Sequence, residues 1–149
     1  MTDILQEKRN VLIEAYTLAK KAEDVLRYSY GKIDPSQLGV SKHPDFLETQ
    51  EAMAARFARL EDILIKKVFR AIAEVEFVDI QRFLDLLNLM EKLRIIDSAA
   101  QWIEMKELRN IIAHEYEFDD LLALYRKVYQ FTPVLFSALE QVKRYLGKA

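Results

Sequence analysis

Apolar residues recur at three- and four-residue spacing along most of the chain, and this helical period constrains the fold more than any other feature. In the N-terminal segment, small and aliphatic residues share one helical face while charged residues fill the other. These inward-facing positions are Leu5, Leu12, Ala15, Ala19, Ala22 and Leu26. With only 3 Gly and 3 Pro among 149 residues, few positions interrupt long helices. The sequence therefore predicts an all-α, up-and-down helical bundle.

Turn and capping signals divide the pattern into five expected helices. Their ranges are about 3–30, 45–75, 79–92, 98–114 and 119–146. Asp45 with Glu48, and Ser98 with Gln101, have the spacing of a capping box and mark the starts of the second and fourth helices. Because this length corresponds to about one domain, we expect a single helical domain over residues 1–149.

Composition limits the possible locations and partners. The formal net charge is −2, which argues against a general nucleic-acid binder, and no stable DNA binding is expected. The chain has no cysteine, so disulfides and thiolate metal sites are excluded. The first residues contain no apolar signal core and no run approaches the length of a membrane span, so we expect a cytoplasmic protein without a membrane partner.

One short segment concentrates chemically active side chains. Arg109 and Asn110 precede His114 and Tyr116 at the end of the fourth expected helix. A guanidinium can grip a phosphate with a planar fork of donors, and an imidazole can exchange a proton near neutral pH. Asn110 can orient either group, and Tyr116 offers a hydroxyl that can itself be modified. This inventory suits phosphate chemistry that needs no metal or cofactor.

The spacing within this segment has a geometric consequence. Arg109 and His114 are five residues apart, so their side chains point about 140° apart around a straight helix. Either the helix frays at His114, or the two residues meet across two molecules. The second option predicts a homodimer. Two helices of roughly 28–31 residues also leave more apolar surface than a small bundle can cover, which again favours self-association or a partner.

Ordinary structural roles compete with these functional ones. Arg109 can form a surface ion pair with Glu104 or Glu107, and His114 can interact with the last carbonyls of its helix. Trp102 is expected to be a core or interface residue. His43 is expected to be a loop residue without a functional role.

The stretch from Glu107 to Tyr116 resembles the HEPN superfamily, and within it the prokaryotic toxins with an R-x4-H-x-Y motif. Those toxins pair with MNT-type minimal nucleotidyltransferase antitoxins. The resemblance implies a dimeric helical bundle that cleaves RNA without a metal at the dimer cleft. It implies that Arg109 and His114 are catalytic, that Asn110 supports them, and that the partner transferase adds AMP groups to Tyr116.

Three hypotheses follow from these residues. The first is a ribonuclease toxin that a cognate nucleotidyltransferase restrains. The second is a non-catalytic subunit that presents a nucleotide or substrate to that transferase, as the resemblance to nucleotidyltransferase substrate-binding proteins implies. The third is a structural helical dimer. We expect the first, with RNA as the substrate and Arg109, His114 and Asn110 as the site.

Overall fold

The computed structural model describes residues 2–114 and 118–148, and these residues form helices joined by turns and short extended segments. The longer helices are α1 (Thr2–Gly31), α2 (Pro44–Ile63), α3 (Arg70–Val75), α4 (Phe83–Lys92), α5 (Ala99–Ala113) and α6 (Phe118–Lys148). A 3-10 turn, η1 (Pro35–Gln37), lies between α1 and α2, and a π-helical turn, η2 (Leu64–Phe69), joins α2 directly to α3. The all-α prediction is confirmed for the described residues, and each of the five expected segments contains a helix.

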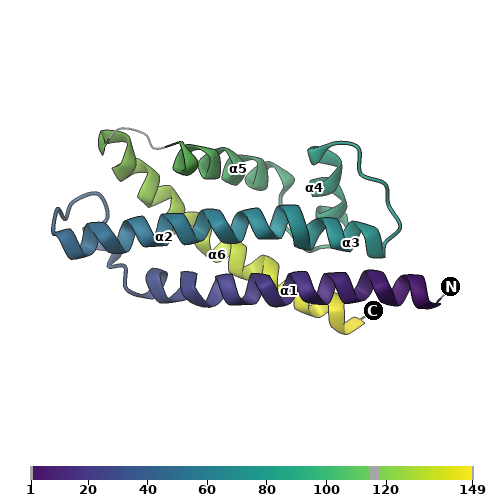
Figure 1. The fold of residues 1–149 in the computed structure, drawn as a ribbon. Helices are drawn as coiled ribbons and strands as arrows, with labels where there is room; N and C mark the ends of the chain where they lie inside the picture. Colours follow the sequence, from purple (N-terminus) through teal and green to yellow (C-terminus); the bar gives the residue numbers. More distant parts are fainter. Residues whose placement is uncertain (1, 115–117, 149) are drawn as a thin grey trace.

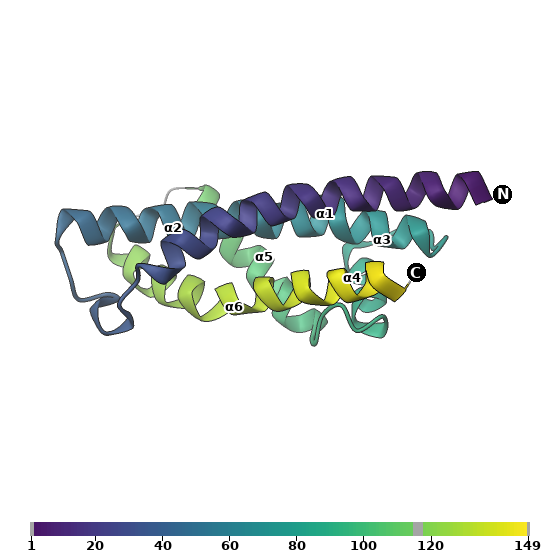
Figure 2. The same cartoon turned by 90° about the horizontal axis from the view of Figure 1, so that it is seen from below.

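The helices form an elongated antiparallel bundle (Figures 1 and 2). α1 runs beside the continuous helix made by α2, η2 and α3. α6 packs against both α1 and α2, and α5 packs against α2 and α6. The short α4 lies at the end of the bundle where α3 finishes, and it packs against both α3 and α5. This arrangement makes α2 the central helix, so it contributes side chains to the core and to the site below.

The core follows the apolar stripes of the sequence. Leu12, Ala19 and Leu26 of α1 are fully or almost fully buried, as the helical spacing predicts. Trp102 is completely buried and packs against Phe69, with 5.0 Å between ring centroids, which confirms its expected place in the core. Burying each large side chain stabilises the fold by about 1.5–3 kcal/mol relative to exposure. Leu5 is 39% exposed because the first turns of α1 extend past the other helices (Figure 2).

Capping side chains set the helix boundaries. Ser98 caps α5 as predicted, since its hydroxyl accepts a hydrogen bond of 3.2 Å from the backbone N–H of Gln101. The second helix begins at Pro44 rather than Asp45. Its cap is His43, whose Nδ1 accepts a hydrogen bond of 3.2 Å from the N–H of Asp45. His43 lies in the loop before α2 as predicted, and its ring also satisfies a backbone donor at the helix start.

The helix expected from Asp79 begins four residues later, at Phe83. Arg82 has extended backbone angles, and the Asp85 carboxylate accepts a hydrogen bond of 3.2 Å from the N–H of Arg82. This side-chain contact fixes the N-terminus of α4 at that point, so residues 79–82 remain outside the helix.

Candidate functional site

The motif residues lie at the C-terminal end of α5. Arg109 and Asn110 are in its last turns, and His114 is the C-cap residue, with its N–H bonded to the carbonyl of Ile111 at 3.2 Å. α5 remains helical up to Ala113, so Arg109 and Asn110 keep their helical directions, whereas His114 has the non-helical backbone angles φ −97° and ψ 6°. The side chains of Asn110 and His114 are exposed, and that of Arg109 is partly exposed. Tyr116 lies outside the described residues.

The guanidinium of Arg109 has two partners. It lies 3.4 Å from a carboxylate oxygen of Asp62 and donates a hydrogen bond of 3.2 Å to the side-chain oxygen of Asn110. Asp62 belongs to α2, so Arg109 makes this ion pair across the bundle rather than with the expected Glu104 or Glu107 on its own helix. Since the side chain remains 30% exposed, its remaining donors are accessible to an anion.

A pocket of about 310 Å³ opens beside Arg109, where α5 faces α2, η2, α3 and α4. Its walls combine basic, acidic and apolar side chains. The lining residues are Glu61, Asp62, Ile65, Lys66, Arg70, Phe83, Lys106, Arg109 and Asn110. Lys66 bonds to Asp62 at 3.1 Å, and the ammonium of Lys106 lies over the Phe83 ring, 4.0 Å from its centroid. Such a pocket is chemically suited to an anion with an adjoining flat or apolar group.

The π-helical turn η2 forms one wall of this pocket. Lys66 lies within η2 and Arg70 follows at the start of α3. π-helical turns interrupt α-helices rarely and occur often at functional sites. Its position beside the Arg109 pocket makes this side of α5 a candidate site in its own right.

Glu61 is the most unusual group in the pocket. Its side chain is 1% exposed, and Oε1 has no hydrogen-bond partner among the described residues. Burial, and to a smaller extent the nearby Asp62 carboxylate, raise the pKa of the carboxyl to about 7, although Arg109, Lys106 and Lys66 lower it. Near neutral pH, Glu61 therefore exchanges a proton inside a pocket that also contains Arg109.

The sequence contains a signal for Glu61 that the motif analysis missed. Glu61 follows Phe57 by four residues and precedes Leu64 by three, so it occupies the apolar face of α2. Glutamate is almost never fully buried without a partner. A carboxyl on a core-facing stripe therefore indicates an unusual environment for that residue. The sequence around Lys66, Arg70 and Lys106 contains no comparable signal for their place in the pocket.

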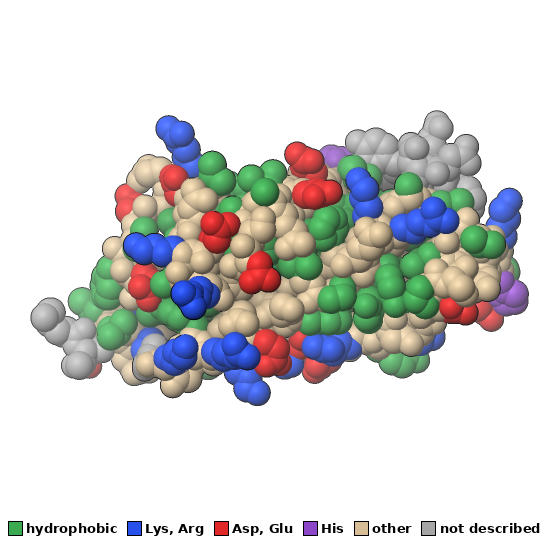
Figure 3. Space-filling view, turned by 180° about the vertical axis from the view of Figure 1, so that it is seen from behind, with side chains coloured by type: hydrophobic (Ala, Val, Ile, Leu, Met, Phe, Trp, Pro, Cys, Tyr) green, Lys and Arg blue, Asp and Glu red, His purple; other side chains and the backbone are tan. Residues whose placement is uncertain are grey.

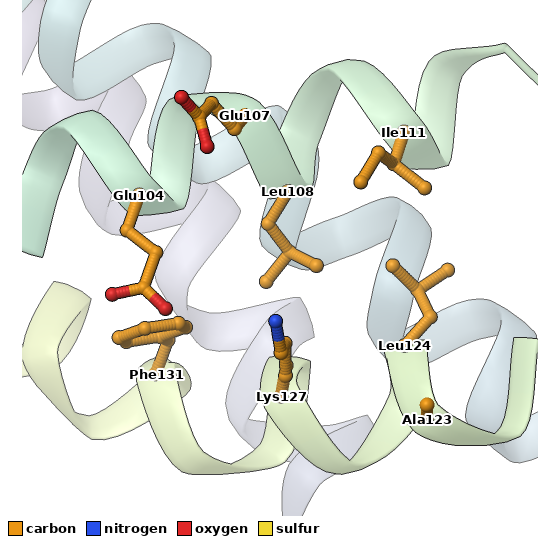
Figure 4. Close-up of a pocket in the computed structure, with 8 residues that line it drawn as sticks. All are labelled: Glu104, Glu107, Leu108, Ile111, Ala123, Leu124, Lys127 and Phe131. Atoms are coloured by element: carbon orange, nitrogen blue, oxygen red, sulfur yellow. The ribbon is translucent and has the colours of Figure 1, made fainter. Parts of the chain in front are cut away.

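A second pocket, of about 340 Å³, lies on the other side of α5, in a groove with α6. Figure 4 shows Leu108 and Ile111 of α5 facing Leu124 of α6, with the ammonium of Lys127 reaching up between the helices. Glu104 and Glu107 line the α5 side. The back of the molecule also shows many hydrophobic side chains between charged ones (Figure 3). The prediction of exposed apolar surface is confirmed, since large apolar side chains such as Ile103 and Ile111 are exposed.

His114 lines neither the Arg109 pocket nor the α5–α6 groove. On a straight helix its side chain would lie about 140° from Arg109 and about 40° from Asn110. Because His114 is the C-cap residue and has non-helical backbone angles, the divergence of Arg109 and His114 stays a prediction.

Other kinds of site find no support within the described ranges. Between residues 2–114 and 118–148, no group of three or more His, Asp or Glu side chains is arranged to hold a metal ion. No helix in the same ranges has both the length and the apolar composition needed to cross a membrane. Comparisons of the chain with models of known protein families, with curated proteins and with solved structures gave no match.

Proposed function

We propose that this protein is the toxin of a toxin–antitoxin pair and acts as a metal-independent endoribonuclease. The observation that carries the proposal is the cluster at the end of α5. There the guanidinium of Arg109 is bonded to Asn110 at 3.2 Å beside a cation-rich pocket, and His114 is exposed on the same helix. These are the groups that bind a phosphodiester and move a proton.

The proposed reaction uses the 2′-hydroxyl of RNA as the nucleophile. That hydroxyl lies next to its own phosphate, so attack is intramolecular. His114 removes its proton as a general base, and Arg109 stabilises the charge that develops on the phosphate oxygens. The 5′-oxygen leaves and takes a proton from a second acid, for which the His114 of a second protomer is the candidate. The products are a 2′,3′-cyclic phosphate and a 5′-hydroxyl.

A homodimer is part of the proposal because of the arrangement of α5. The five-residue spacing directs Arg109 and His114 about 140° apart on a straight helix, and His114 does not line the Arg109 pocket, so the proposed complete site combines residues from two copies. The groove lined by Leu108, Ile111 and Leu124 is an apolar surface between α5 and α6. Burying this surface between two copies related by a two-fold axis would place two α5 ends near each other.

Regulation is proposed to act on Tyr116, two residues beyond His114. A cognate MNT-type nucleotidyltransferase antitoxin would transfer AMP from ATP to the tyrosine hydroxyl, with release of pyrophosphate. The attached phosphate would compete with RNA for Arg109, and the nucleotide would obstruct the cleft. This single modification would silence the site without unfolding the protein.

One observation favours a second function, a non-catalytic nucleotide- or substrate-binding subunit of a minimal nucleotidyltransferase. Within one protomer, Arg109 and Asn110 share a pocket that His114 does not line. A phosphate bound in this pocket, away from the proposed base His114, fits a binding role better than the proposed cleavage. RNA cleavage by the isolated protein separates the two functions.

The test is expression of the protein alone, followed by assay of the purified protein on RNA. We expect growth inhibition and products with 2′,3′-cyclic phosphate ends. Arg109→Ala and His114→Ala should each lower cleavage by about 10²-fold or more while circular dichroism stays unchanged. Matched controls are Arg144→Ala, at an exposed arginine of α6, and His43→Asn, which keeps a capping side chain at the start of α2.

The result that contradicts the proposal is equally direct. If the wild-type protein is harmless and leaves RNA intact without any partner, it is not a ribonuclease toxin. If Arg144→Ala or His43→Asn impairs cleavage as strongly as the α5 variants, the activity does not depend on the proposed site.

A further inference from the structure

The pocket beside Arg109 contains more positive charge than its carboxyl groups balance. Its cations are Lys66, Arg70, Lys106 and Arg109. Asp62 already contacts two of them, Lys66 at 3.1 Å and Arg109 at 3.4 Å. Within the described part of the chain, Arg70 and Lys106 have no carboxylate at salt-bridge distance. Two cations on neighbouring walls are thus available to an anion.

Glu61 supplies a second, independent indication of a ligand. The residue lines the same pocket, is 1% exposed, and leaves Oε1 without a hydrogen-bond partner. A buried polar atom that stays unpaired costs about 1–3 kcal/mol, so native structures rarely keep one without a reason. The pocket volume of about 310 Å³ is far larger than the roughly 15 Å³ that a single water requires. It therefore has room for a polyatomic group that pairs with Glu61.

We propose that this pocket binds a phosphate group, held by Arg70, Lys106 and Lys66 and by a hydrogen bond from the neutral carboxyl of Glu61. A neutral carboxyl is a donor, so it can pair with an anionic oxygen. With Glu61 neutral, the four cations and the Asp62 carboxylate give the pocket a net charge of +3, which attracts an anion. Phe83 and Ile65 form an apolar wall beside it. The phosphate would be either free or part of an RNA backbone; the RNA source rests on the proposed function, whereas the pocket does not.

Proton binding and anion binding are coupled at this site. The charged groups that line the pocket with Glu61 are Asp62 from α2, Lys66 from η2, Arg70 from α3, and Lys106 and Arg109 from α5. α4 contributes the uncharged Phe83. Because the pKa of Glu61 is about 7, its protonated fraction falls from about nine-tenths at pH 6 to about one-tenth at pH 8. If only the neutral form binds, the Kd for an anion of constant charge rises about tenfold over that range.

The experiment is an NMR titration of the full-length protein with sodium sulfate, whose charge does not change between pH 6 and pH 8. Sodium chloride at equal ionic strength is the reference. We expect saturable shifts around η2 and α5, with a Kd about tenfold weaker at pH 8 than at pH 6. Lys66→Gln and Arg70→Gln should each weaken binding by about tenfold or more. Glu61→Gln should bind sulfate with no dependence on pH.

Controls keep the test decisive. Lys143→Gln, at an exposed lysine on α6, should bind sulfate like the wild type. Circular dichroism checks each fold, and Lys106→Gln replaces any variant that does not fold. A response no larger than that to chloride, or an unchanged Kd in Lys66→Gln and Arg70→Gln or in the variant that replaces one of them, overturns the proposal. Persistent pH dependence in Glu61→Gln overturns the role of Glu61.

Two competitors distinguish the source of the phosphate. A 2′-O-methyl RNA trinucleotide cannot be cleaved through its 2′-position but still presents backbone phosphates. If it displaces sulfate at lower concentration than inorganic phosphate does, the pocket binds the RNA backbone. If inorganic phosphate is the more effective competitor, the pocket binds free phosphate. Displacement by neither overturns the proposal, and a protein that binds sulfate but cleaves no RNA refutes only the proposed function.

Discussion

Replacing Glu61 with Gln should stabilise the protein at alkaline pH and change little at acidic pH. The side chain is 1% exposed, and its pKa in the folded protein is about 7 against 4.5 for the free group. The folded state therefore holds its proton more tightly than the unfolded state does. The contribution of Glu61 to the free energy of unfolding is fully present below pH 4.5, and it is lost as the pH rises through about 7.

The magnitude follows from the two pKa values. At about 1.4 kcal/mol per pKa unit, ionising Glu61 in the folded protein costs about 3 kcal/mol once the pH is well above 7. Glutamine has nearly the same shape and does not titrate in this range. The free energy of unfolding of Glu61→Gln should thus exceed that of the wild type by about 2–3 kcal/mol at pH 8 and by much less at pH 5.

Urea denaturation followed by far-UV circular dichroism, at several pH values from 5 to 8, measures this difference. Glu104→Gln is the matched control, because Glu104 is an exposed carboxyl on α5 and should show no such trend. The reasoning is refuted if the free energies of unfolding of Glu61→Gln and wild type differ by the same amount from pH 5 to pH 8. Such a result would mean that Glu61 has the same pKa in the folded and unfolded states.

Three further predictions concern the assembly, the switch and the fold. Ile111→Glu, at a position 39% exposed in the α5–α6 groove, should leave the helical content intact but convert the proposed dimer to a monomer in light scattering at micromolar concentration; a wild-type monomer would remove the basis for a shared cleft. Incubation with the cognate nucleotidyltransferase and ATP should add AMP units to the wild type and none to Tyr116→Phe, and intact-mass spectrometry that finds the same additions in both proteins would exclude Tyr116. Ser98→Ala should lower the free energy of unfolding by about 1 kcal/mol because α5 loses its N-terminal cap, whereas Ser98→Asp should preserve stability in the same urea assay.

The sequence alone determined the class of fold and most helix positions, because helices form from local information. The apolar period marks which face turns inward, and Leu12, Ala19 and Leu26 are indeed buried. Ser98 was identifiable as a cap because a capping hydroxyl and its target lie within one turn. The same reasoning failed at His43 and at the start of α4, where a histidine ring and Asp85 satisfy the backbone instead of the expected residues.

Some features of the candidate site could also be predicted from the sequence, and others could not. Arg109, Asn110 and His114 are candidates because of their chemistry, and their spacing on one helix predicts that Arg109 and His114 diverge. The ion pair between Arg109 and Asp62 was not predictable, because it joins residues far apart in the chain that meet only when α5 packs on α2. Spacing along α5 suggests Glu104 and Glu107 as partners of Arg109, whereas the structure pairs Arg109 with Asp62.

Tertiary structure alone decided the character of Glu61. Its pKa depends on how much water the neighbouring helices exclude and on which charges they bring near, and neither quantity is encoded in a short segment. The pocket likewise exists because five elements meet, with Lys66 and Arg70 contributed at the π-helical turn and Lys106 from α5. Local sequence therefore specifies which chemical groups a helix carries, whereas the rotation and packing of whole helices decide which of those groups share one solvent-excluded space.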